Sequence, residues 1–188
     1  MAMPLSHYSP VFSNKAWEKG DGYITYFSCE HTSSVKKGKA GKRGIYSREV
    51  ESSLGNDLES RAALIYQKLL SFEDLCVEER RVWAQFILSQ HVRTPGFMKY
   101  EKATNEFHGI TEHPQHDRVG CLECGDLYYV ANRDWCYLIA HDDDYFVRTD
   151  NPVFMSGFIE RPETVVFYPL SPKVCFVACS MPKGWTPF

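Results

Sequence analysis

The sequence predicts an α+β fold, a single domain in which central helices pack on a mostly antiparallel sheet. Strand-like runs of aromatic and β-branched residues stand near the N-terminus and in the C-terminal third, and the middle of the chain has helical apolar periodicity. Neither a strand–helix–strand alternation nor an internal repeat is present. At 188 residues the chain has the length of one domain and can bury a core without disulfides or metal.

The composition excludes several classes of protein. An aromatic content of 14% is too high for a disordered chain, and 21 basic against 24 acidic residues give a net charge of −3, which does not attract nucleic acid globally. The seven cysteines are an odd number, which fits reduced thiols better than a disulfide framework. No secretory signal and no membrane-spanning apolar run is found. We therefore expect a soluble cytoplasmic protein with no membrane partner.

The N-terminal part predicts one strand and one basic loop. Residues 22–28 are aromatic and β-branched and follow a Gly-Asp-Gly turn, so they are expected to form a strand that joins the sheet. Residues 33–44 alternate basic residues with glycine and predict a flexible basic loop. Lys36 and Lys37 in this loop are candidate contacts for a phosphate backbone, although most charge runs are solvated loops.

Three helices are predicted in the middle of the chain. Asn56 and Glu59 have the spacing of a capping box and open a helix over 57–70. A core helix follows over about 75–93 and ends before a Pro-Gly pair, and a shorter helix is expected over 97–108.

The C-terminal third predicts strands. Residues 135–140 and 145–149 flank an acidic turn at 141–144, the pattern of a β-hairpin. Residues 165–168 and 174–178 predict two further strands.

The helix over 75–93 carries polar residues on a face that should meet the core. Phe86, Gln90 and Arg93 share this face at i, i+4 and i+7. An inward arginine keeps its charge and needs a carboxylate or a phosphate, and Asp150, which follows a predicted strand, is the candidate partner. Two interpretations fit: a structural ion pair that ties the helix to the sheet, or part of a functional site.

Short motifs in a fixed order resemble the domain-of-unknown-function family 4238, which has bacterial, phage and fungal members. The resemblance covers about residues 6–95 and 127–178, and its motifs are His7-Tyr8-Ser9-Pro10-Val11-Phe12, Leu58-Glu59-Ser60-Arg61-Ala62-Ala63, Gln90-His91-Val92-Arg93-Thr94-Pro95, Thr149-Asp150-Asn151-Pro152-Val153 and Pro169-Leu170-Ser171-Pro172. It implies that five polar residues converge on one site: His7, Glu59, Gln90, Arg93 and Asp150. It implies no reaction.

The five residue types suit the hydrolysis of a phosphodiester. His7 titrates near neutrality and can exchange a proton, while Arg93 can hold a phosphate through two hydrogen bonds. Gln90 can orient a water, and Glu59 and Asp150 can share a divalent cation through their oxygen atoms.

We therefore expect a small hydrolytic enzyme of a bacterial or phage toxin or defence system, acting on nucleic acid or a nucleotide. Tyr8 and Asn151, the neighbours of the motif residues, are candidate substrate-binding residues. One alternative is a non-enzymatic binding protein, an immunity or anti-defence inhibitor with a protein partner, whose Arg/Asp cluster is structural. A further alternative is a nucleotide sensor that uses the same arginine without turnover.

A Cys/His-rich loop over 109–125 is a second candidate site. Cys121 and Cys124 have the two-residue spacing and trailing glycine of a zinc knuckle, and His113 and His116 would complete a Cys₂His₂ set for a structural zinc. The interval between the two pairs is short for a tetrahedral site, so free thiols and surface histidines remain the alternative.

Overall fold

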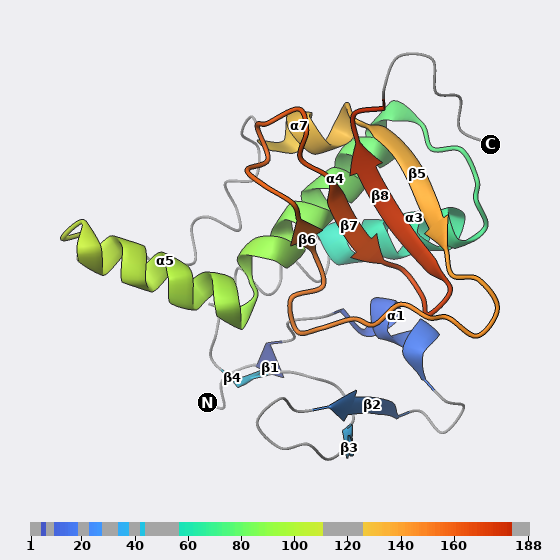
Figure 1. Cartoon of the computed structure of the whole chain (residues 1–188), viewed down its shortest axis with the longest axis horizontal. Helices are drawn as coiled ribbons and strands as arrows, with labels where there is room; N and C mark the ends of the chain where they lie inside the picture. The colour runs from blue at the N-terminus through green and yellow to red at the C-terminus, as the bar shows by residue number, and fades with distance from the viewer. Residues whose placement is uncertain are drawn as a thin grey trace.

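A computed structural model describes residues 5–6, 10–18, 23–27, 34–37, 42–43, 57–110 and 126–181 (Figure 1). Helices and a four-stranded antiparallel sheet build its main body, which confirms the α+β class. The sheet faces the viewer in Figure 1, with two helices behind it and one helix projecting to the side.

The sheet is formed by the C-terminal third of the chain. Its strands are β5 (Asp134–Ile139), β6 (Phe154–Met155), β7 (Val166–Pro169) and β8 (Val174–Cys179), in the order β5-β8-β7-β6. All neighbours are antiparallel, so alternate residues point to opposite faces. Tyr168 and Phe176 lie opposite each other in the β7–β8 register, and both are fully buried against the helices.

Two of the predicted helices cover this face, as α3 (Glu59–Leu70) and α4 (Val77–Val92). The apolar positions of α4 meet the sheet, where the Trp83 ring stacks on Phe86 at 5.0 Å and meets the edges of Tyr168 at 5.7 Å and Phe176 at 6.0 Å. Burial of a large apolar side chain contributes roughly 1.5–3 kcal/mol, so this aromatic layer is a principal source of stability. A short helix, α7 (Asp126–Ala131), packs on α4 ahead of β5.

The third predicted helix is α5 (Pro95–Phe107), and its two ends follow local rules. Thr94 caps its start, since the Thr94 hydroxyl accepts a hydrogen bond from the Phe97 amide at 3.2 Å and proline takes the first helical position. Gly109 ends it at a φ of +66°, and the Ile110 amide then reaches back to the Asn105 carbonyl at 2.9 Å. This is a Schellman motif, in which the left-handed residue favours glycine.

The N-terminal part forms two small pairs of strands. Strand β1 (Leu5–Ser6) pairs with β4 (Lys42–Arg43), and β2 (Ile24–Phe27) pairs with β3 (Ser34–Lys37). The strand expected over 22–28 is therefore present, but it does not join the main sheet. Where a basic loop was expected over 33–44, the described residues belong to β3 and β4.

Helix α1 (Val11–Asn14) and a short 3₁₀ turn, η1 (Lys15–Trp17), fasten the N-terminal part to the body. The Phe12 ring lies 5.4 Å from Tyr66 of α3 and 5.5 Å from Phe86 of α4. Phe12 thereby extends the aromatic core to the opening segment of the chain.

The predicted hairpin over 135–149 is wrong. β5 pairs with β8, which comes about forty residues later, and residues 145–149 form no strand. The acidic segment is instead held by Lys173, whose ammonium donates to the carbonyls of Asp142 and Asp144. The sequence spacing suits a hairpin, but the more apolar β8 is the better partner for a half-buried strand.

Among the described residues, no helix is both long and apolar enough to cross a membrane.

Candidate functional site

The polar residues at the C-terminal end of α4 lie inside the protein. Gln90 is fully buried, and Arg93, which follows the last residue of α4, is 2% exposed. Phe86 is buried on the same face, so the shared face predicted for these three residues is the core-facing one.

Arg93 pairs with Glu59 rather than with Asp150. The Arg93 Nη1 atom lies 2.7 Å from Glu59 Oε1, and the Glu59 side chain keeps 23% of its surface exposed. Glu59 is the first residue of α3, where the helix dipole favours a carboxylate, and Arg93 stands beyond the C-terminus of α4, where it favours a cation. The α3–α4 packing brings these two ends together, so the ion pair links two helices instead of a helix and the sheet.

Asp150 is exposed in the segment between β5 and β6. Next to it, the Thr149 hydroxyl donates to the Asn151 carbonyl at 2.8 Å and accepts from the Asn151 amide at 3.2 Å. These bonds form a local turn that presents the side chains of Asp150 and Asn151 to solvent. The prediction that Asp150 neutralises Arg93 is therefore wrong, because its carboxylate is outside the core that holds the guanidinium.

The Gln90 amide is the most unusual group of the site. Its oxygen and its nitrogen are both buried, and neither has a hydrogen-bond partner among the described residues. A buried polar group in this state costs about 1–3 kcal/mol. The indole nitrogen of Trp83 in the aromatic core is buried in the same way, and Gln90 differs from it in standing three residues before the charged Arg93 at the end of α4.

Two buried tyrosines border the cluster. The Tyr66 hydroxyl donates to the carbonyl of Leu170, within the Pro169–Pro172 motif. Tyr168 lies in the electrostatic field of Arg148, Arg93 and Glu59, but burial is the larger effect and raises the pKa of its hydroxyl. Burial likewise raises the pKa of Tyr66. Both tyrosines are neutral around the cluster at physiological pH.

Arg148 connects the Asp150 segment to α1. Its Nη1 atom donates to the Ser13 carbonyl at 2.8 Å, and its Nη2 atom donates to the side-chain oxygen of Asn14. The Ser13 hydroxyl in turn donates to the Pro10 carbonyl at 2.9 Å. Arg148 thus links the residue before the Thr149–Val153 motif to the residues that follow the opening motif. Arg148 was missed from the sequence, although its position two residues before Asp150 was an available signal.

Several predicted site residues lie outside the described residues: His7, Tyr8, His113, His116, Cys121 and Cys124. Lys36 and Lys37 are described only in their backbone, as part of β3, opposite Thr25 and Ile24 of β2. Within the described part of the chain, no group of three or more His, Cys, Asp or Glu side chains could hold a metal ion.

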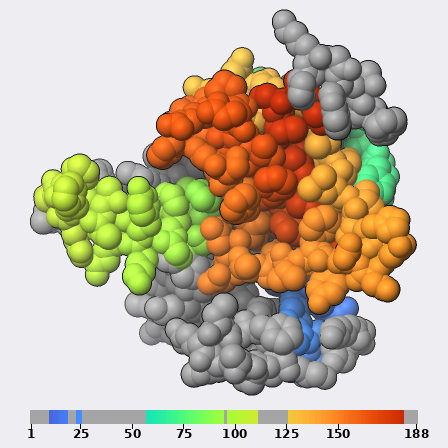
Figure 2. Space-filling view, in the orientation of Figure 1, coloured from blue at the N-terminus to red at the C-terminus, as the bar shows by residue number. Residues whose placement is uncertain are grey.

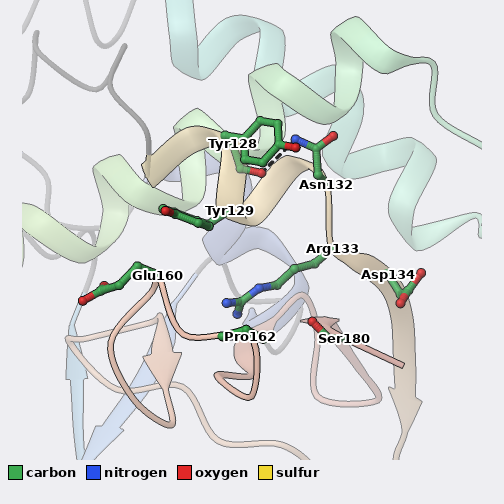
Figure 3. Close-up of a pocket in the computed structure, with 8 residues that line it drawn as sticks. All are labelled: Tyr128, Tyr129, Asn132, Arg133, Asp134, Glu160, Pro162 and Ser180. Carbon is green, nitrogen blue, oxygen red and sulfur yellow. Dashed lines mark hydrogen bonds between the residues drawn. The ribbon is translucent and has the colours of Figure 1, made fainter. Parts of the chain in front are cut away.

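A small hollow of about 290 Å³ lies elsewhere, between α7 and the segment after β6 (Figure 3). Arg133 extends into it, with Tyr129 and Glu160 across the hollow. The Arg133 guanidinium donates to the carbonyls of Ile159 at 2.8 Å, Arg161 at 2.7 Å and Thr164. Because these carbonyls accept the hydrogen bonds of the guanidinium, Arg133 fixes the loop before β7 rather than binding a ligand. It too was missed from the sequence.

Comparison with known proteins gives a family and no activity. The family model described as "Protein of unknown function (DUF4238)" matches residues 7–118. No curated protein and no solved structure matches.

Proposed function

Because the chain belongs to the DUF4238 family, which carries no assigned reaction, we propose a function from the site itself: a small hydrolase that cleaves phosphodiester bonds. The site is the cluster of Glu59, Gln90 and Arg93 at the meeting ends of α3 and α4. Of these side chains, Glu59 reaches solvent and Gln90 does not.

The observation that carries this proposal is the unpartnered amide of Gln90. A leucine or methionine at this position would pack without leaving a polar group unsatisfied, so the glutamine has an energetic cost. A polar group that costs stability close to a charged side chain is typical of a site where stability is traded for function. Gln90 can therefore serve a bound water or a substrate oxygen that enters past Glu59.

The proposed roles follow from burial. Glu59 is the accessible group and would accept the proton of an attacking water, while the buried Arg93 acts as a positioning residue that holds the carboxylate. His7 would protonate the leaving oxygen, and Asp150 would share a divalent cation with Glu59. Tyr8 and Asn151 remain proposed substrate contacts. Lys36 and Lys37 favour a nucleic-acid or nucleotide substrate, as expected of a toxin or defence nuclease.

The test is turnover by purified protein on single-stranded DNA, RNA and nucleotides, with and without Mg²⁺ or Mn²⁺. Glu59→Gln should abolish cleavage because it removes the charge and keeps the shape of the side chain; it also takes the counter-charge from Arg93 and lowers the melting temperature, so activity is assayed below that temperature, where the protein is folded. Glu78→Gln is the matched control, because Glu78 also pairs with an arginine, Arg61 at 3.2 Å, but on the open surface. Equal activity of wild type and Glu59→Gln, or no turnover on the whole panel, contradicts the proposal.

A second candidate function is the binding of a protein partner, with the cluster serving only the fold. The burial of Arg93 favours it, since a guanidinium that is 2% exposed and already paired resembles a structural ion pair. In that case Glu59→Gln lowers the melting temperature as it does for the hydrolase, but it leaves partner binding unchanged. A stoichiometric partner recovered equally by wild type and Glu59→Gln supports this function over the first.

A further inference from the structure

Helix α5 stands out from the body of the protein. Figures 1 and 2 show it projecting sideways, with its N-terminal end at the body and its far end in solvent. Among the described elements, α5 makes its principal contact with α4. The Phe97 ring anchors the near end, 5.2 Å from His91. From Tyr100 onward, one side of the helix carries side chains that the body does not cover.

This uncovered side is apolar. Tyr100 is 68% exposed and Phe107 is 85% exposed, and Ala103 between them is also exposed. The three residues follow each other at spacings of three and four, so they form one stripe along the helix, called here the α5 stripe. Exposed rings aligned in this way on a projecting helix are typical of an interaction surface rather than of a solvated face.

We propose that the α5 stripe is a homodimer contact, in which α5 packs antiparallel against α5 of a second copy of this chain. The stripe is nearly symmetric about Ala103, with one large ring at about one turn on either side. In an antiparallel pair that crosses at Ala103, Tyr100 of each copy lies within one residue, about 1.5 Å along the axis, of Phe107 of the other. The small alanine at the crossing allows the two backbones to approach closely.

The charges beside the stripe are complementary in the same arrangement. Lys99 and Glu106 stand seven residues apart along one flank of the stripe, and both are exposed. When two copies cross antiparallel at Ala103, Lys99 of each lies within one residue of Glu106 of the other. In a parallel pair the same flanks of the two helices lie on opposite sides of the contact, so Lys99 of one copy would not meet Glu106 of the other. Both observations therefore favour a second copy over an unrelated occupant, and a two-fold symmetric contact over a head-to-tail one.

The contact should be weak. α5 has 13 residues, so its length is only about 20 Å. Two such helices bury less than the roughly 1,200 Å² of a standard interface, and we expect a dissociation constant on the order of micromolar.

The first experiment measures oligomeric state by sedimentation velocity over a concentration series of the full chain. The mass should rise with concentration from 21.7 kDa toward twice that value. Phe107→Glu should weaken dimerisation by at least about tenfold, because it removes an apolar contact and adds a charge to the stripe. Leu64→Glu is the matched control, since Leu64 is a 72% exposed apolar residue of α3, and it should leave the dimer unchanged.

The second experiment tests the antiparallel arrangement. Lys99→Glu and Glu106→Lys should each weaken the dimer, since each places like charges together across the contact. A mixture of the two variants should associate at least as tightly as the wild type, because every cross-helix pair is again opposite in sign. Glu106 also pairs with Lys102 of its own helix at 3.8 Å, and Glu106→Lys breaks this pair within one chain. Mixing the two variants cannot restore a pair within one chain, so rescue by mixing shows that the lost contact is between chains. A wild type that stays monomeric throughout the series, a dimer that survives Phe107→Glu, or a mixture without rescue overturns the proposal.

Discussion

The replacement Gln90→Met should make the protein more stable. Methionine has nearly the shape of glutamine but no amide, so the change removes two buried polar atoms that lack partners among the described residues. An unsatisfied buried group costs about 1–3 kcal/mol, and a volume-conserving swap loses less than about 1.5 kcal/mol to repacking. A net gain of roughly 1–2 kcal/mol should remain, which for a chain of this size raises the melting temperature by about 2–8 °C.

Thermal and urea unfolding of the two proteins measure this gain, with Gln67→Met on the exposed side of α3 as the control. The control should change the free energy of unfolding by no more than about 0.5 kcal/mol. A melting temperature that falls in Gln90→Met would refute the reasoning, since it would mean that the amide has partners in the folded protein. If the proposed hydrolase is correct, the stabilised variant should also lose turnover, and a variant that gains stability with full activity would remove Gln90 from the site.

Three further outcomes are expected. Arg93→Met should lower the free energy of unfolding by about 1–3 kcal/mol in urea titrations, because it leaves the partly buried carboxylate of Glu59 without its partner. Asp150→Asn should change the free energy of unfolding by less than about 0.5 kcal/mol. A larger loss in Asp150→Asn than in Arg93→Met would support the pairing of Arg93 with Asp150 that the sequence predicted. Stability should hold up to about pH 10, the ordinary pKa of a tyrosine, and fall above it, because burial raises the pKa of Tyr66 and Tyr168 and their ionisation is linked to unfolding. In a pH series of urea titrations, Tyr66→Phe should reduce the fall in the free energy of unfolding at alkaline pH. An unchanged fall would contradict the role given to the ionisation of Tyr66. Arg148→Ala should cost about 1.5–3 kcal/mol and speed hydrogen exchange over 11–17 before other segments, and uniform exchange would show that the contact does not hold α1.

The helices and the fold class could be predicted because they depend on local patterns. The apolar period of α4 and the Pro-Gly pair after it are sufficient to place the helix and its end, and Thr94 with Pro95 is a local cap signal. The pairing of the strands was harder to predict from the sequence. The prediction joined β5 to residues 145–149 because they are near in sequence, while the true partner is chosen by burial on a sheet assembled from distant segments.

The candidate site, too, could be predicted from the sequence only in part. The shared face of Gln90 and Arg93 follows from helical spacing, and their burial agrees with it. The partner of Arg93 does not follow, because Glu59 and Asp150 are both carboxylates at element ends and only the α3–α4 packing distinguishes them. Arg133 donates to backbone carbonyls, which every residue possesses, and Arg148 donates to one such carbonyl and to the side chain of the distant Asn14, so no residue pattern in the sequence identifies these targets.

The contact of Arg148 with Ser13 has a consequence for how the chain folds. It joins residues 135 positions apart, so its formation closes a loop of most of the chain. Closing a loop of this length costs conformational entropy. The Arg148–Ser13 contact therefore adds little to the stability of the fold until the segments between the two residues are in place. We expect α1 to dock last, after α3 and α4 have built the surface that receives Phe12. A chain in which α1 has not docked exposes the ring of Phe12 and the aromatic surface that receives it, and such surfaces favour aggregation.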